Sequence, residues 1–190
     1  TLDNLHQDLT LPLPPTAATG QAPIVPRQEI RLSGIRYAYP SVPNKPVLDG
    51  FDLVIPVNTS VGIQGPSGAG KSTVMDILLG LLTPQDGTLS VDNIPITTGN
   101  LAAWQRSIGY VPQHIYLADA SVAENIAFGV PRDAIDMSAV ECAARAAQIH
   151  DFIIGELAQG YDTFVGARGI RLSGGQRQRI GIARALYGNP

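Results

Sequence analysis

The sequence predicts an α/β fold in which a phosphate-binding loop joins a strand to a helix. A glycine-rich loop at 65–73 follows the short apolar run 61–63, and apolar residues recur at helical spacing after it. Residues 29–55 contain stretches in which apolar and polar side chains alternate, which is typical of half-buried strands. A second glycine-containing motif, at 172–176, opens another helical pattern. These three observations predict sheet and helix in one domain with two phosphate-handling motifs.

The first motif contains the pattern G-x-x-x-x-G-K-[ST]. Its residues are Gly65, Pro66, Ser67, Gly68, Ala69, Gly70, Lys71, Ser72 and Thr73. Glycines let successive backbone N–H groups turn toward phosphate oxygens, which a Cβ atom would obstruct. Lys71 adds a charge for the β- and γ-phosphates, and the Ser72 hydroxyl is a ligand for Mg²⁺. The alternative is a glycine-rich turn that matches by chance, and the order strand, loop, helix argues against it.

Secondary-structure patterns surround this loop. The apolar run 61–63 predicts a buried strand, and the helix that begins at the loop adds a partial positive charge at its N-terminus. Apolar residues at helical spacing indicate this helix: Val74, Ile77, Leu78, Leu81 and Leu82. Residues 30–32 and 51–55 alternate in polarity on either side of a proline-rich loop at 40–46. Asp86-Gly87 signals a turn before a strand at 88–91.

The second motif, Leu172 to Gln176, reads first as the start of a well-capped helix. Ser173 is the expected N-cap, and Gln176 stands at the third helical position, so the pair predicts a capping box. The residues expected to face a core are Ile180, Ala183 and Leu186. A cap does not require the pair Gly174-Gly175, and two glycines weaken a helix. They are explained if a ligand approaches the backbone closely.

The run Leu172 to Ala185, LSGGQRQRIGIARA, resembles the signature motif of the ATP-binding domain of ABC transporters. In that family this helix start faces the γ-phosphate of an ATP held by the P-loop of the opposite domain. The resemblance implies ATP and Mg²⁺ as ligands and a second nucleotide-binding domain in a head-to-tail dimer. The resemblance assigns Ser173, Gly174, Gly175 and Gln176 to ATP binding, with Ser173 and Gly175 acting in trans. Catalytic roles are implied for Lys71, Ser173 and Gly175.

Two further positions are assigned by the same resemblance. Val111-Pro112-Gln113 resembles the Q-loop, so Gln113 is expected to reach Mg²⁺ and the attacking water, a catalytic and metal-binding role. Tyr39, before Pro40, resembles the aromatic residue that stacks on adenine. Tyr37 is the alternative in register, and a plain strand tyrosine is the alternative for both.

Two stretches resemble exporters whose membrane domain is fused to the ATP-binding domain. They are 121–129, which also reads as a capping box, and 162–169, where such exporters commonly carry acidic residues at the positions of Phe164 and Ala167. The implied function is ATP hydrolysis that powers export across a membrane. The rivals are a soluble ABC ATPase, a two-cassette translation protein, an importer subunit and a non-catalytic nucleotide-binding module. The interval between the two motifs leaves no room for the coiled coil of DNA-repair ATPases.

The expected fold class is therefore α/β: a P-loop NTPase core with a small antiparallel β subdomain and an inserted helical subdomain, incomplete at the C-terminus. Residues 1–28 are expected to be a linker from an upstream membrane domain, with 1–9 either a helix tail or a disordered end. Residues 29–190 are the partial ATP-binding domain, with the helical subdomain at about 114–172. The family's apolar strand ending in Asp-Glu does not occur, so these 190 residues are expected to bind ATP without efficient turnover.

The composition indicates which broad classes of protein fit the chain. With 44% hydrophobic and 15% charged residues, the chain can bury a core, and its net charge of −3 gives no electrostatic case for nucleic acid. No apolar run approaches the roughly 18 residues of a membrane span. The family resemblance implies a position on the cytoplasmic face of a membrane, as part of a membrane protein. Single residues expected to have structural roles are Cys142 as a buried thiol, Trp104 at an exposed helix edge, His6, His114 and His150 on the surface, and Ser138 with Glu141 as a capping box.

Overall fold

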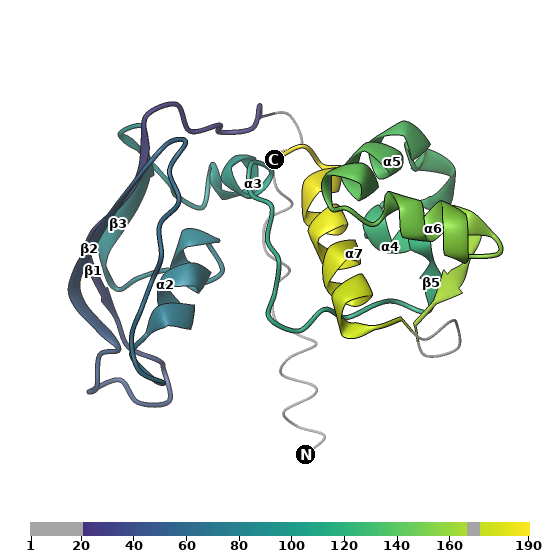
Figure 1. Ribbon diagram of the computed structural model, residues 1–190. Helices are drawn as coiled ribbons and strands as arrows, with labels where there is room; N and C mark the ends of the chain where they lie inside the picture. The colour runs from purple at the N-terminus through teal and green to yellow at the C-terminus, as the bar shows by residue number, and fades with distance from the viewer. Residues whose placement is uncertain (1–20, 167–171) are drawn as a thin grey trace, which may run out of the picture. The chain divides into compact units, whose positions relative to one another are not determined.

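The computed structural model describes residues 21–166 and 172–190, and the chain divides into two compact units (Figure 1). The first unit ends at Gln105 and the second begins at Arg106. The expectations for residues 1–20, including His6, and for Ala167 lie outside the described residues.

The first unit is built on a four-stranded antiparallel sheet in the order β2-β1-β3-β4. The strands are β1 (Glu29–Tyr37), β2 (Leu48–Pro56), β3 (Asp86–Val91) and β4 (Ile94–Pro95). Leu32 lies opposite Leu53 on one side and Leu89 on the other, so the predicted alternation places apolar side chains on a common face. Helices α2 (Lys71–Leu78) and α3 (Leu101–Gln105) complete the unit. The expected small antiparallel sheet is therefore present.

Asp86-Gly87 lies inside β3, so the turn predicted there is wrong. Asp86 pairs with Arg36, and the register of β1 against β3 shifts between Ser33 and Arg36. Gly87 has a φ of +87°, and a Cβ on it would come within 2.5 Å of the carbonyl oxygens of Ser33 and Gly34. This close approach of two strands at a bulge requires glycine, which explains the residue without a turn.

The apolar run 61–63 does not form the buried strand that was predicted. Val61 is exposed, and no other strand among the described residues pairs with the run. An extended segment becomes a strand only when a neighbour accepts and donates its backbone hydrogen bonds. The helix after the loop does begin at Lys71, as predicted, but it ends at Leu78, and Leu81 is exposed.

Trp104 is a core residue and not the exposed edge residue that was expected. Its side chain is 3% exposed, and the indole Nε1–H donates to the carbonyl oxygen of Leu78 at 2.8 Å. That carbonyl belongs to the last turn of α2, where the intrahelical partners run out. The bond therefore satisfies both the buried indole and the end of the helix.

The second unit is mostly helical. Its helices are α4 (Val122–Ile126), α5 (Met137–Ala146), α6 (His150–Glu156) and α7 (Gly174–Tyr187), with 3-10 turns η1 (Arg132–Ala134) and η2 (Gly160–Asp162). The short strands β5 (Ala120–Ser121) and β6 (Phe164–Val165) pair antiparallel. The core includes Val122, Ile126, Val140, Ala144, Ile149, Ile153, Val165, Ile180 and Ala183. Helix α7 thus shares a core with the helices that precede it.

Arg184 joins α7 to α4 within this unit. Its guanidinium donates to the carbonyl oxygens of Asn125 and Tyr116 at 2.8 and 3.0 Å and lies 4.7 Å from the ring centre of Phe128. Asn125 is fully buried, and its side-chain amide bonds both the N–H and the carbonyl of Ala118. Burial lowers the pKa of Arg184 from its ordinary value. Backbone carbonyls and an aromatic face stabilise the charge in place of water.

Four other expectations for this unit are wrong. The N-cap of α5 is Asp136, which accepts from Ser138 N and Ala139 N, so Ser138 and Glu141 do not form a capping box. Cys142 is exposed because it lies on the outer face of α5. His150 is buried, with Nδ1 2.8 Å from the Tyr161 hydroxyl. Leu186 is exposed, unlike Ile180 and Ala183.

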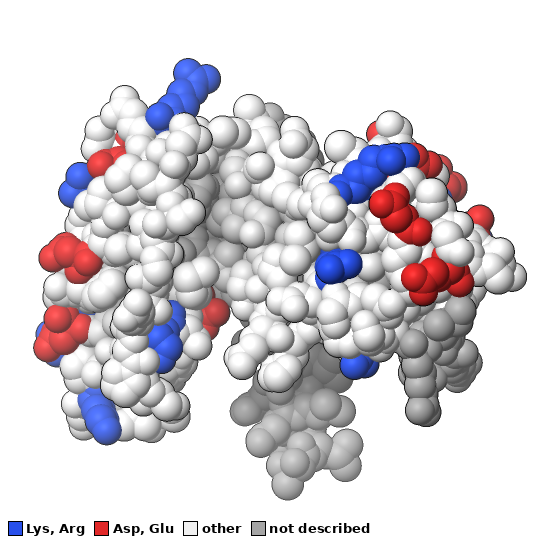
Figure 2. Space-filling view, in the orientation of Figure 1, with Lys and Arg blue, Asp and Glu red and all other residues white. Residues whose placement is uncertain are grey.

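Charged side chains of both signs are interspersed on the face of each unit shown in Figure 2. In residues 21–166 and 172–190, none of the helices has the length and apolar content needed to cross a membrane.

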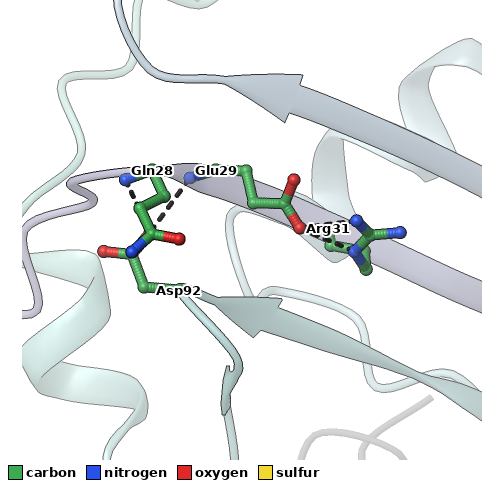
Figure 3. A network of polar contacts seen from close by, with 4 residues as sticks. All are labelled: Gln28, Glu29, Arg31 and Asp92. Atoms are coloured by element: carbon green, nitrogen blue, oxygen red, sulfur yellow. Dashed lines mark hydrogen bonds and ion pairs between the residues drawn. The ribbon is translucent and has the colours of Figure 1, made fainter.

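The Asp92 carboxylate fixes the segment that leads into β1 (Figure 3). Asp92 and Asn93 have positive φ and form the tight turn between β3 and β4. The carboxylate accepts backbone N–H groups of Arg27, Gln28 and Glu29 at 2.6, 2.8 and 2.9 Å. The bond from Glu29, followed by that from Arg27, holds the pKa of Asp92 below its ordinary value of 3.8.

We expect Asp92→Asn to lower the melting temperature at pH 7, because asparagine keeps the turn conformation but loses the negative charge that three N–H donors face. The folded-state pKa lies below 3.8, so this contribution is complete above pH 3.8 and is lost as the pH falls through the lower folded value. The difference in melting temperature between the two proteins should therefore shrink below pH 3.8. Fluorescence of Trp104, the chain's single tryptophan, reports unfolding of this unit.

Asp86→Asn, at the other end of β3, is the matched control. The Asp86 side chain is exposed and has no hydrogen bond or ion pair among the described residues. An equal loss in melting temperature for both variants would contradict the role assigned to Asp92.

Candidate functional site

The glycine-rich loop of the first unit is open to solvent and ends in a buried glycine. Residues 65–69 are exposed, whereas Gly70, the N-cap of α2, is buried. Gly68 and Gly70 have φ of +81° and +87°, values that residues with a Cβ rarely adopt. A Cβ at Gly70 would also lie 3.0 Å from Val47 Cγ1 and 3.1 Å from Leu48 Cδ2. Left-handed backbone and close packing together explain why this position is glycine.

Lys71 folds back over this loop. Its Nζ donates to the carbonyl oxygens of Gly65 and Pro66, both at 2.8 Å. A lysine ammonium has three donors, so one remains for a ligand. These bonds hold the positive charge beside the loop, where it can attract an anion.

The start of α2 differs from the starts of α4, α5 and α7. Ser121, Asp136 and Ser173 each cap their helix with a side-chain oxygen. Gly70 has no such oxygen, and no side chain of the described chain caps α2. The first-turn N–H groups therefore have no side-chain cap beside the exposed loop, and Ser72 in the same turn is exposed. This is a suitable cradle for phosphate with an attached Mg²⁺.

Tyr39 contacts the end of this loop through its hydroxyl group. Tyr39 is 38% exposed, and its hydroxyl is 3.0 Å from Oγ1 of Thr73, in the first turn of α2. Tyr37 is 6% exposed and packs edge-to-face on Tyr39, with ring centres 5.2 Å apart. Only Tyr39 has an accessible aromatic surface, which favours it for base stacking. The choice between the two remains a prediction.

The start of α7 carries the predicted capping box. Ser173 Oγ accepts from Gln176 N at 3.2 Å, and Gln176 Oε1 accepts from Ser173 N at 2.8 Å. A Cβ at Gly174 or Gly175 would meet nothing within 4 Å, whereas one at Gly181 would come 2.5 Å from Ile115 Cδ1. Internal packing therefore explains Gly181 but not the other two glycines. This fits the expectation that something outside the chain approaches them.

Gln113 and the start of α7 line one hollow in the second unit. The hollow has a volume of about 340 Å³ and is lined by Gln113, His114, Ile115, Gly174, Arg177 and Gln178. Arg177 was not singled out from the sequence, although it follows Ser173 by one helical turn, and His114 was expected only to lie on the surface. A polar hollow with an arginine is suited to an anionic ligand.

The structure thus groups the predicted site residues in two sets. Tyr39 and residues 65–73 lie in the first unit, and Gln113 with residues 173–176 lies in the second. The capping box of the 121–129 stretch is also present: Glu124 accepts from Ser121 N, and this bonding lowers the pKa of Glu124. In the 162–169 stretch, Phe164 is exposed on β6.

Comparison with known proteins identifies the family. Residues 48–190 match the family described as ABC transporter. The chain is 42% identical over 161 residues to ABC transporter B family member 28 of Arabidopsis thaliana, covering 85% of the chain and 22% of the relative. It is 45% identical over 163 residues to ATP-binding cassette sub-family B member 10, mitochondrial, of Mus musculus, with coverage of 85% and 22%. Multidrug resistance protein homolog 65 of Drosophila melanogaster is 43% identical over 162 residues, 85% of the chain and 12% of the relative.

A solved structure agrees in fold. The structure of a bacterial Atm1-family ABC exporter with ATP bound matches with a TM-score of 0.81 and 33% identity, covering all of this chain and 32% of that one. The chain belongs to the ABC transporter family, of which it represents the ATP-binding domain, and it is homologous to the B-family exporters. The expected ABC ATPase fold class is therefore confirmed. The chain spans less than a quarter of the length of these curated relatives.

We expect Gly70→Ala to destabilise the first unit more than Gly68→Ala. Both substitutions place a Cβ at positive φ, which costs about 1–2 kcal/mol. Only the Gly70 site adds contacts, with Val47 and Leu48, and overpacking of this kind costs roughly 1 kcal/mol more. Urea unfolding followed by Trp104 fluorescence measures both. Equal destabilisation would show that backbone strain alone requires glycine at Gly70.

Proposed function

We propose that this chain is the part of an exporter that binds ATP and, within the whole protein, hydrolyses it to drive transport across a membrane. The observation that carries the proposal is the exposed glycine-rich loop before an uncapped helix, with Lys71 held over it. The homology to B-family ABC transporters supports the transport class over a soluble ATPase.

The residues at hand fit ATP and Mg²⁺. Gly68 and Gly70 adopt the left-handed backbone that glycine allows, Lys71 supplies positive charge, and Tyr39 offers an aromatic face. Ser72 would be a ligand for Mg²⁺ at the loop, and Gln113 is proposed as a ligand for Mg²⁺ from its resemblance to the Q-loop; the bound ion would offset phosphate charge. Phosphoryl transfer needs positioning and charge stabilisation more than covalent chemistry. Lys71, Ser173 and Gly175 would position the phosphates and stabilise their charge. The 190 residues alone should bind ATP without efficient turnover, because they lack the family's Asp-Glu strand end.

The open start of α7 supports a second nucleotide-binding domain as partner. In a head-to-tail dimer, the glycines at 174 and 175 would approach the phosphates held by the partner's loop. A membrane domain in the same polypeptide would be the other partner, with residues 1–28 as the linker and the domain on the cytoplasmic face. The much greater length of the relatives supports this arrangement.

Lys71→Ala should weaken ATP binding by about 1.5–3 kcal/mol, the usual worth of a hydrogen bond to a charged group. Isothermal titration calorimetry with MgATP on the purified protein measures the change. The control is Arg31→Gln, which removes a positive charge from the same unit where that charge is paired with Glu29 at 2.6 Å. Equal ATP affinity of wild type and Lys71→Ala would refute the assigned role.

Gly175→Asp should leave ATP binding by a single domain nearly intact and strongly reduce ATP turnover by the complete protein. The position is open, and an acidic residue in the first turn is favourable for a helix, so the variant should fold. The aspartate would instead repel the phosphates held by a partner. Ser173→Ala should show a smaller loss of turnover.

Gly155→Asp in α6 is the control, because that position is equally open. Monomer affinity comes from calorimetry and turnover from phosphate release. If a folded Gly175→Asp protein loses monomer binding, α7 does not act on a partner's nucleotide.

A further inference from the structure

The hydroxyl groups of Tyr39 and Thr73 connect the two parts of the nucleotide site in the first unit. Tyr39 follows β1, Thr73 lies in the first turn of α2, and their oxygens are 3.0 Å apart. Thr73 is 3% exposed, so its hydroxyl is withdrawn from solvent. Threonine in a helix can direct this hydroxyl to its own backbone. Here it pairs instead with a residue 34 positions away.

The backbone that carries Tyr39 is also fixed. The Gln85 side chain clamps the preceding residue, since Ala38 N–H donates to Gln85 Oε1 and Gln85 Nε2 donates to Ala38 O, both at 2.8 Å. Gln85 is itself held, because its N–H donates to the carbonyl of Arg36. The Tyr37 ring then packs against the Tyr39 ring at 87°. Without Thr73, the ring would still be able to swing about its side-chain torsions on this fixed backbone.

We propose that Thr73 is a positioning residue for base recognition: its hydroxyl bond to Tyr39 sets the aromatic ring at a fixed orientation to the phosphate loop. This rests on the proposed function, in which Tyr39 stacks on the base. A nucleoside triphosphate contacts ring and loop at once, so an oriented ring removes an ordering cost from binding. Inorganic triphosphate has no base, and the bond should not affect its binding.

The test uses Tyr39→Phe, Thr73→Val, Thr73→Ser and the double variant Tyr39→Phe/Thr73→Val in the full-length protein. Affinities for MgATP and for magnesium triphosphate are measured by calorimetry. We expect Tyr39→Phe and Thr73→Val each to weaken ATP binding about two- to tenfold, the effect of losing one net hydrogen bond. The double variant should be no worse than either single variant. Triphosphate binding should be unchanged in Tyr39→Phe, and Thr73→Ser, which keeps the hydroxyl, should retain ATP binding.

Two controls separate the proposal from its foundation. Tyr37→Phe removes a hydroxyl from the neighbouring ring and should leave ATP binding unchanged. Tyr39→Ala should weaken ATP but not triphosphate; if it does not, the stacking role of Tyr39 fails. If Tyr39→Ala does weaken ATP while Tyr39→Phe and Thr73→Val do not, stacking stands and the positioning bond is overturned. If Thr73→Val weakens triphosphate as much as ATP, Thr73 acts on phosphate and the proposal is wrong.

Discussion

The N–H groups at the start of each helix need partners, and this requirement organises the chain around its two motifs. Helices α4, α5 and α7 meet it internally, with oxygens of Ser121, Asp136 and Ser173. Helix α2 begins at a glycine without such an oxygen. Helix α6 also lacks a side-chain cap, but the start of α2 differs from it in following the exposed glycine-rich loop. The start of α2 therefore combines uncapped N–H groups with an open loop, and this combination suits an anion.

The start of helix α7 is both capped by the chain's own side chains and open to a ligand. Its capping box satisfies donors within the chain, while Gly174 and Gly175 keep the surrounding space empty. Glycine in a helix costs about 1 kcal/mol relative to alanine, and at Gly181 the contact with Ile115 explains why that cost is accepted. Nothing in the described chain explains it for the other two. Gly174 and Gly175 therefore reduce the stability of α7 at the place where a group from outside the domain is expected to bind.

Features that depend on a few neighbouring residues could be predicted from the sequence. The loop, the start of α2 and the capping boxes at Ser121 and Ser173 all lie within short spans. Ser138 shows the limit of such local patterns. The pattern S-x-x-E predicts a cap at Ser138, but Asp136, two residues earlier, is the N-cap of α5. Trp104 and His150 were misplaced because their partners, Leu78 and Tyr161, are distant in sequence or lie on another element. The bond of Tyr39 to Thr73 and the clamp of Gln85 on Ala38 were equally invisible, since no local pattern encodes contacts across 34 or 47 positions.

The attachment at Asp92 gives the sheet a particular mechanical order. Tension applied to the chain ahead of β1 acts on three bonds that converge on a single carboxylate, in addition to backbone bonds such as the one from Ile24 N to Ala103 O. Because those three share one acceptor group, they resist together, and the load passes to the turn between β3 and β4 before it reaches the ladder of β1. The force would thus act on the sheet through β3, and β1 would be protected from being peeled away from its neighbours.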